Sequence, residues 1–191
     1  QLKALKGGLC HAPPGTWKLI ATPAMLLPRP LLLADEATPE AALHCDSWCG
    51  YPASLREVLA HIADHAIHHC VFLSGDEHLP SLTQVVVQRM DIPDQPKVSL
   101  SSIHAGALYA PYPFANATPA DFLEADTFEF TVPYPAQPHH GRPVHPMRRY
   151  QCTVRTVFPP VRHEGYIRIS LSSNASTSQV CFRDALDPSR D

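Results

Sequence analysis

Residues 70–78 restrict the fold of this chain more than any other stretch, because a short apolar run leads directly into a glycine turn and polar side chains. The run at 70–73 predicts a buried strand, and Gly75 permits a tight turn at its end. Asp76 and His78 follow two residues apart. Because open α/β sheets bind ligands outside the carboxyl ends of their strands, the stretch predicts an α/β fold with a metal or phosphate site there. The alternative interpretation is a surface turn with a hydrogen-bonded histidine.

A strand and a helix upstream of this stretch complete an α/β unit. Residues 17–21 predict the strand, and we expect the helix to run from Leu55 to about His68. Ser54 and Glu57 match the capping box, in which two side chains satisfy orphaned backbone donors at a helix start. Residues 2–9 are expected to be the end of a helix, which two consecutive glycines would stop. The apolar positions of the main helix repeat at helical spacing and predict a face that packs on the sheet: Leu55, Val58, Leu59, Ile62 and Ala66.

The second half of the chain alternates with a period of two. Residues 150–157, 166–171 and 179–183 each alternate apolar with polar side chains, which predicts half-buried antiparallel strands. Residues 81–90 are ambiguous, and we interpret them as a strand because they contain three consecutive valines. Residues 133–146 contain five prolines and predict an exposed loop.

Composition narrows the classes of protein to which the chain can belong. Its 191 residues are 45% hydrophobic, which is enough for one domain with a sizeable core. The formal charge of −3 provides no basic stripe, so we do not expect a nucleic-acid-binding module. The longest apolar run, at 24–34, is shorter than the roughly 20 residues that cross a bilayer, so no membrane span is predicted. The six cysteines show no Cys-x-x-Cys spacing and are interpreted as buried free thiols.

Two blocks of residues follow one another in the order of a known family pattern. The first is Cys45-Asp46-Ser47-Trp48-Cys49-Gly50-Tyr51-Pro52, with Arg56 four residues further on. The second, after the predicted helix, is Leu73-Ser74-Gly75-Asp76-Glu77-His78. Together they resemble the Asp-x-Trp-x-Gly-Tyr, Arg and Leu-(Ser/Thr)-Gly-Asp-x-His pattern of the alkaline phosphatase D-like branch of the calcineurin-type metallophosphatases. The resemblance covers roughly residues 17–116.

The resemblance implies a more specific α/β fold, the C-terminal part of a calcineurin-like αββα sandwich. One α/β unit would be followed by a largely antiparallel, β-rich region. Residues 1–93 would form the C-terminal part of the metallophosphatase core with both motif blocks, and residues 94–191 a β-rich continuation of the same domain. The family's earlier ligand motifs, an Asp, a Gly-Asp and an Asn, are not found in the sequence. We therefore expect a missing N-terminal portion of the same protein to be a partner. The sequence leaves the cellular location of the protein open: the cytoplasm is slightly favoured, and export of the parent protein is the alternative.

The same resemblance implies metal-site roles for the second block. Asp76 would be a metal ligand, and His78 a second ligand or a catalytic phosphate contact. Glu77 between them is expected to point elsewhere as a solvated or hydrogen-bonding carboxylate. The cofactor would be divalent or trivalent metal ions such as calcium, iron, manganese or magnesium. His104 is a further catalytic candidate because it follows a strand-like segment, whereas Thr22 stands where similar enzymes usually present a metal-binding His.

The first block supplies candidates for binding a phosphate ester substrate. These are Asp46, Tyr51 and Arg56, since a guanidinium suits a phosphate. An arginine at a helix start is equally suited to pairing with Asp46 and fixing the loop. We favour that structural role for Arg56 and also a structural role for Trp48.

The expected function is that of a C-terminal part of a metal-dependent phosphoesterase, which hydrolyses phosphate monoesters or diesters by metal-activated hydroxide. The isolated chain is expected to be inactive, because a cation needs several ligands. The alternative is a non-catalytic, β-rich binding or interaction module without a metal centre. His61 and His65 have the one-turn spacing of a metal chelate, although a solvated helix face is the simpler interpretation.

Overall fold

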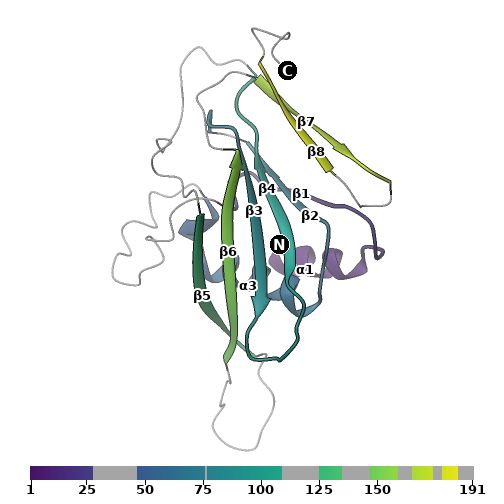
Figure 1. Cartoon of the computed structure of the whole chain (residues 1–191). Coiled ribbons are helices and arrows are strands. Elements are labelled where there is room, and N and C mark those ends of the chain that lie inside the picture. Colours follow the sequence, from purple (N-terminus) through teal and green to yellow (C-terminus); the bar gives the residue numbers. More distant parts are fainter. Residues whose placement is uncertain are drawn as a thin grey trace, which may run out of the picture.

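The computed structural model of the chain describes residues 1–27, 47–75, 77–108, 125–134, 147–158, 165–173 and 178–184. These residues form a mixed six-stranded sheet, a separate two-stranded sheet, and helices that lie behind the large sheet in Figure 1. The predicted α/β class is therefore confirmed. The helical elements are α1 (Leu2–His11), the 3-10 turn η2 (Trp48–Gly50) and α3 (Pro52–Asp64). The strands are β1 (Lys18–Ala21), β2 (Cys70–Ser74), β3 (Ser81–Arg89), β4 (Val98–His104), β5 (Ala125–Pro133), β6 (Met147–Phe158), β7 (Gly165–Leu171) and β8 (Ser178–Asp184).

The large sheet has the strand order β1-β2-β4-β3-β6-β5. β1, β2 and β4 are parallel to one another, whereas β3, β6 and β5 join the sheet by antiparallel pairing. The predicted strand-helix-strand unit is confirmed as β1-α3-β2. Because the three parallel strands run in one direction, the residues that follow Ala21, Ser74 and His104 meet at one edge of the sheet. We call this edge, the upper one in Figure 1, the carboxyl edge.

α3 packs on the sheet through the apolar face that its spacing predicts. Leu55, Val58, Leu59 and Ile62 are each at most 1% exposed and belong to the hydrophobic core. Burying each such side chain contributes about 1.5–3 kcal/mol of hydrophobic free energy. Packing against the sheet therefore stabilises α3 more than any cap at its ends would.

α3 begins three residues earlier than the sequence predicts. Pro52 occupies its first turn, and Tyr51 is the N-cap without a side-chain capping hydrogen bond. The capping box of Ser54 and Glu57 is therefore wrong. Proline starts the helix instead, because its fixed φ suits the first helical position and its missing N–H costs nothing there. The Glu57 carboxylate forms an ion pair with Lys6 of α1.

A Schellman motif ends α3 at Asp64, four residues before the predicted end. Ala66 has a φ of 48°, in the left-handed region. The N–H groups of Ala66 and Ile67 donate to the carbonyls of residues 63 and 62, at 3.2 and 3.0 Å. Glycine usually occupies this left-handed position, so the sequence carried no stop signal. His68 and His69 consequently lie in the connection to β2 and not at the helix end.

α1 continues through its two glycines to His11, so the predicted stop at residues 7–8 is wrong. Each glycine costs a helix roughly 0.5–1 kcal/mol relative to alanine. Leu2, Leu5 and Leu9 offset this cost because all three pack against the core, and Leu9 is 5% exposed.

None of the helices among the described residues has the length and apolar character required to cross a bilayer.

Two buried thiols agree with the interpretation of the cysteines, and a third departs from it. Cys70 and Cys152 are free and buried, and burial raises the pKa of the first to about 11 and of the second to about 12. Cys10 is free but exposed. Its position at the end of α1 brings it close to α3.

A cluster of charged and polar side chains joins the end of α3 to β3 and β6. The Asp64 carboxylate accepts hydrogen bonds from Arg89 at 3.1 Å, from Tyr150 at 2.8 Å and from Arg148. Arg89 also donates to both oxygens of Asp91, at 3.0 and 2.9 Å. The Arg89 hydrogen bonds hold the pKa of Asp91 at about 2, below its ordinary value of 3.8. Burial raises the pKa of the Tyr150 phenol, and the hydrogen bond to Asp64 raises it further.

The pairing of Asp91 with Arg89 should weaken in acid. Because the pKa of Asp91 is lower in the folded state, its contribution to stability is complete above about pH 4 and is lost as the pH falls towards about 2. Asp91→Asn imitates the protonated carboxyl group. We expect this variant to be less stable than the natural chain at neutral pH and to approach it below pH 4. Urea unfolding across this range measures the difference, and a difference that stays constant would contradict the assignment.

Candidate active site at the carboxyl edge

Trp48 fixes the loop that follows β1 at the carboxyl edge. Its indole N–H donates to Thr22 Oγ1 at 2.9 Å, and its backbone N–H donates to the Met25 carbonyl at 3.1 Å. The Thr22 N–H donates to the Leu73 carbonyl at 2.9 Å, which extends the pairing of β1 with β2. The Trp48 ring also packs against the hydrophobic core. These contacts agree with a structural role for Trp48, and they occupy the Thr22 hydroxyl.

His104 joins the ends of two parallel strands to the loop that follows β2. Its side chain is 1% exposed, and its Nε2 lies 3.0 Å from the carbonyl oxygen of Glu77. A carbonyl can only accept, so Nε2 carries the proton. Nδ1 forms a hydrogen bond with the Ser74 hydroxyl, at 2.9 Å. The buried His104 imidazole thus contacts Ser74 and Glu77, which stand on either side of Gly75 and Asp76 in the sequence.

Glu77 is only 3% exposed, which excludes the solvated carboxylate and leaves the hydrogen-bonding one of the two predicted alternatives. That expectation assumed an extended backbone, whose side chains alternate in direction. Residues 77 and 78 instead form a bend, to which the alternation does not apply. The Glu77 residue is therefore buried, and its backbone carbonyl contacts His104 of β4.

The residues predicted to form the site differ in their burial and in the element that carries them. His78 is half-buried on the loop after β2, and His104 supports the same loop. Tyr51 is 66% exposed at the start of α3. Asp76 and Asp46 lie outside the described residues. The roles of all five in metal or substrate binding stay predictions.

Arg56 is half-buried and lines a cleft of about 670 Å³, a volume that would hold a small molecule. In the described part of the chain, no residue of the loop after β2 lines this cleft. Arg56 therefore lines a cleft to which His78 does not contribute. The cleft lies between the helices and the β5–β6 side of the sheet, and its charged lining residues include Lys6, Glu57, Asp64 and Arg148.

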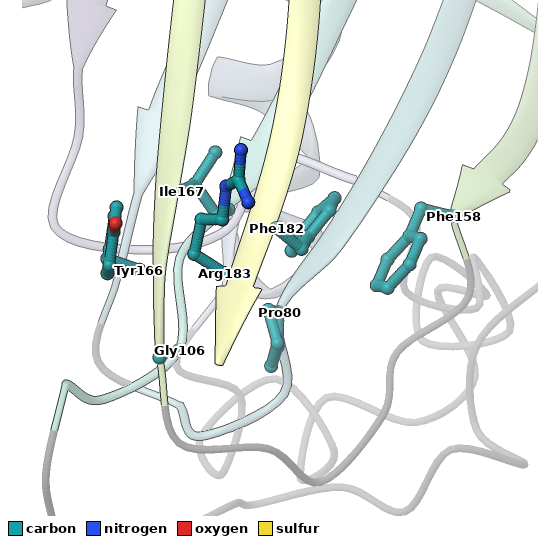
Figure 2. Close-up of a pocket in the computed structure, with 8 residues that line it drawn as sticks. Pro80, Gly106, Phe158, Tyr166, Ile167, Phe182 and Arg183 are labelled. Atoms are coloured by element: carbon teal, nitrogen blue, oxygen red, sulfur yellow. The ribbon is translucent and has the colours of Figure 1, made fainter. Parts of the chain in front are cut away.

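A small pocket marks the place where the β7–β8 hairpin meets the carboxyl edge (Figure 2). Its volume of about 20 Å³ admits roughly one water molecule, so it is too small for a phosphate ester. The rings of Phe158 and Phe182 stack there with centroids 3.8 Å apart, and the Gly165 N–H donates to the Ala107 carbonyl at 2.9 Å. The pocket is thus part of the packing that fixes the hairpin. It is lined by Pro80, Gly106 and Phe158, and by Gly165, Tyr166, Ile167, Phe182 and Arg183 of the hairpin.

Ser74 is a site residue that sequence reasoning did not single out. Its hydroxyl fixes the His104 ring, and the parallel register places the two residues opposite each other in β2 and β4. They are 30 residues apart in the chain, and no local pattern encodes this register. The one available signal was the Ser or Thr that the family pattern carries before Gly-Asp.

Comparison with known proteins adds evidence that is independent of the geometry. The family model described as PhoD-like phosphatase matches residues 1–179 of this chain. The match includes both motif blocks and all three parallel strands of the carboxyl edge. Searches of curated proteins and of solved structures gave no match.

Proposed function

Since the chain belongs to the PhoD-like phosphatase family, as its motif blocks indicated, we propose that it acts in a metal-dependent phosphoesterase that hydrolyses phosphate monoesters or diesters. The carboxyl edge would contribute Asp76 and His78 to the metal centre. The observation that carries this proposal is the contact of buried His104 with Ser74 and with the Glu77 carbonyl. It holds the Gly-Asp-x-His loop at the ends of parallel strands, where sheets of this class bind ligands.

The donor set of this loop fits hard and borderline metal ions. A carboxylate oxygen of Asp76 suits calcium, magnesium, manganese or ferric iron, and the half-buried imidazole of His78 suits transition metals. Two such ions, when bound close together, supply hydroxide at neutral pH and stabilise charge during displacement at phosphorus. Asp76 and His78 would hold them, and His78 would also orient the phosphate.

We assign His104 a positioning role in this centre. Both of its ring nitrogens are engaged with Ser74 and the Glu77 carbonyl, so it acts through the loop and not on the substrate. His104→Ala should lower the metal affinity of the active protein by about 10–100-fold, as the loss of other groups that orient metal ligands does. His104→Gln retains a donor for the Glu77 carbonyl and should recover part of the loss. Isothermal titration with Mn²⁺ measures this, and an unchanged affinity in a folded Ala variant would refute the role.

This chain would hold only part of the ligand shell. A cation needs several protein ligands, and the family's Asp, Gly-Asp and Asn motifs do not occur in the 191 residues. At the carboxyl edge, the Thr22 hydroxyl already accepts the Trp48 indole N–H. An N-terminal portion of the same protein would supply the remaining ligands.

Hydrolysis of p-nitrophenyl phosphate and its bis ester tests this division. The 191-residue chain with added Ca²⁺, Mn²⁺ or Fe³⁺ should release nitrophenol no faster than buffer. A longer polypeptide that includes the earlier motifs should hydrolyse the substrates. Rapid hydrolysis by the chain alone would show that its own residues complete the centre. Absence of hydrolysis by the longer polypeptide would favour the alternative, a non-catalytic module.

The same family supports a proposal for the finer fold. Helices cover one face of the large sheet, and Leu19 of β1 is 54% exposed. We propose that a second sheet packs on the opposite face, as in a calcineurin-like αββα sandwich. An experimental structure of the longer polypeptide should show Leu19 covered by this second sheet. A solvent-exposed Leu19 would contradict the sandwich.

A further inference from the structure

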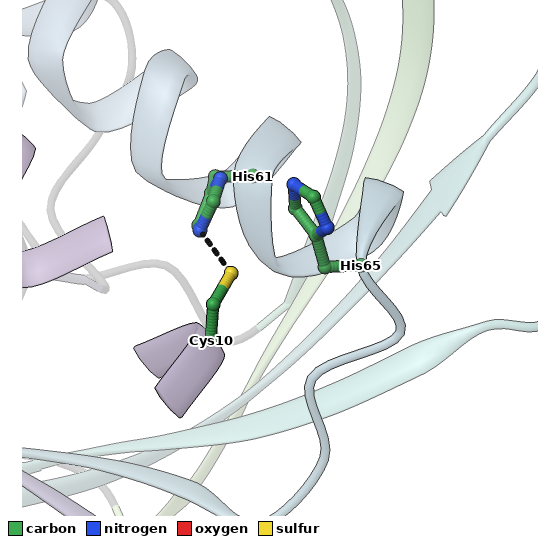
Figure 3. A group of neighbouring side chains, drawn as sticks. All are labelled: Cys10, His61 and His65. Atoms are coloured by element: carbon green, nitrogen blue, oxygen red, sulfur yellow. Dashed lines mark hydrogen bonds between the residues drawn. The ribbon is translucent and has the colours of Figure 1, made fainter. Parts of the chain in front are cut away.

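Three potential metal ligands converge between α1 and α3 (Figure 3). Cys10, at the end of α1, points towards α3, and its Sγ lies 3.2 Å from His61 Nε2. His65 follows one helical turn after His61, and the centroids of the two rings are 4.4 Å apart. The candidate ligand atoms of the three side chains all lie within 4.8 Å of one another. Because α3 runs away from the carboxyl edge, this cluster lies at the opposite end of the helix from the predicted catalytic loop.

The separations within the cluster are close to those of a tetrahedral site. Metal distances of about 2.3 Å to sulfur and about 2.0–2.1 Å to nitrogen place two tetrahedral ligand atoms roughly 3.3–3.6 Å apart. The distance from Cys10 to His61 already matches this within a few tenths of an ångström. His65 is exposed, so small rotations of its side chain suffice to bring its nitrogen to the same point.

We propose that Cys10, His61 and His65 bind a borderline transition-metal ion of the zinc class, with water as the fourth ligand. A thiolate with two imidazoles is a poor ligand set for calcium or magnesium and a good one for Zn²⁺. An open fourth position is typical of three-ligand zinc sites. The site is independent of the proposed phosphoesterase centre, from which it differs in place and in ligand type.

The simpler interpretation is a thiol–imidazole hydrogen bond on a solvated helix face. His61 does not fit that interpretation, because it is half-buried against α1 and its Nε2 also lies 3.1 Å from the Lys6 carbonyl. Burial lowers the pKa of His61, which favours the neutral ring that a metal binds. Metal binding would replace the hydrogen bond to Lys6, shift the ring proton to Nδ1 and release the thiol proton of Cys10 to solvent.

A bound ion would fasten α1 to α3. The described polar contacts between these helices include the partly exposed ion pair of Lys6 with Glu57, a type of pair that contributes about 0–1 kcal/mol. An ion that binds only the folded state stabilises it in proportion to the logarithm of its concentration above Kd. The docking of α1 would therefore depend on metal supply.

Titration of the purified chain with Co²⁺ tests the proposal. Thiolate-bound cobalt gives a charge-transfer band in the near ultraviolet, and tetrahedral cobalt absorbs strongly in the visible. We expect both signals to saturate at one Co²⁺ per chain and to disappear when Zn²⁺ displaces it. Zn²⁺ should also raise the melting temperature.

Cys10→Ser and His65→Ala should each weaken Co²⁺ binding by more than about 100-fold, because loss of groups outside the ligand shell already costs 10–100-fold. Both residues are exposed, so the variants should fold, which circular dichroism checks. Cys181→Ser and His68→Ala are matched controls that should keep the signals. Asp76→Ala should also keep them, which separates this site from the carboxyl edge. Lack of the charge-transfer band in the natural chain, or its persistence in both ligand variants, would overturn the proposal.

Discussion

Replacing Asp64 with alanine is expected to lower the free energy of unfolding by about 3–5 kcal/mol, the usual effect of removing one partner from a buried ion pair. The Asp64 carboxylate accepts hydrogen bonds from Arg89, Arg148 and the Tyr150 hydroxyl. These guanidinium side chains are only 10% and 16% exposed, so alanine would leave two poorly hydrated positive charges without their shared partner. Since Asp64 is also the last residue of α3, the loss would free that end of the helix from β3 and β6.

Equilibrium unfolding in urea measures this loss. A matched control is the ion pair of Arg149 with Glu129, whose side chains are 63% and 55% exposed. Glu129→Ala should change the unfolding free energy by less than about 1 kcal/mol, because such exposed pairs contribute little. An Asp64→Ala variant no less stable than the Glu129 control would show that the cluster does not hold α3.

The strand-helix-strand unit could be predicted because its signals are local. The apolar run before Gly75 and the helical spacing of Leu55, Val58, Leu59 and Ile62 identify a buried strand and the helix that packs on it. The three consecutive valines at 85–87 identified β3, in which Val85 and Val87 are buried on either side of an intermediate position. Each of these signals comes from residues that are close together in the chain, so it can be read from the sequence of one element alone.

Features that depend on distant contacts could not be predicted in the same way. α1 passes through two glycines because its leucines reach the core, and α3 ends at a left-handed alanine for which the sequence gives no glycine signal. β5 was missed although Phe128, Phe130 and Val132 alternate correctly. Its position became evident only in the sheet, where Phe130 stacks on Tyr150 with ring centroids 5.1 Å apart.

The candidate site shows the same division between local and distant information. Family motifs pointed to the Gly-Asp-x-His loop, and the family match supports a phosphatase. The hydrogen bonds that anchor this loop run from Ser74 to His104 and from His104 to the Glu77 carbonyl. They arise from the parallel register of β2 with β4, a long-range pairing that the sequence of either strand does not specify.

Asp76→Ala is expected to have the largest effect on activity of any single change. If Asp76 is a metal ligand, its loss should exceed the 10–100-fold effect of removing a group that only orients a ligand. We therefore expect turnover of the proposed phosphoesterase to fall by more than about 100-fold. Stability should change little, since the anchors of the loop are the neighbouring Ser74, Glu77 and His104. Asp94→Ala, in the exposed turn between β3 and β4, is the matched control and should leave turnover unchanged.

The most direct test of the metal centre measures two quantities on the same sample of the Asp76→Ala protein. These are the metal content per chain, determined by elemental analysis, and the rate of phosphate ester hydrolysis. The proposed centre predicts that both fall together relative to the natural protein and to Asp94→Ala. A variant that keeps its full metal content and its full rate of hydrolysis would contradict it.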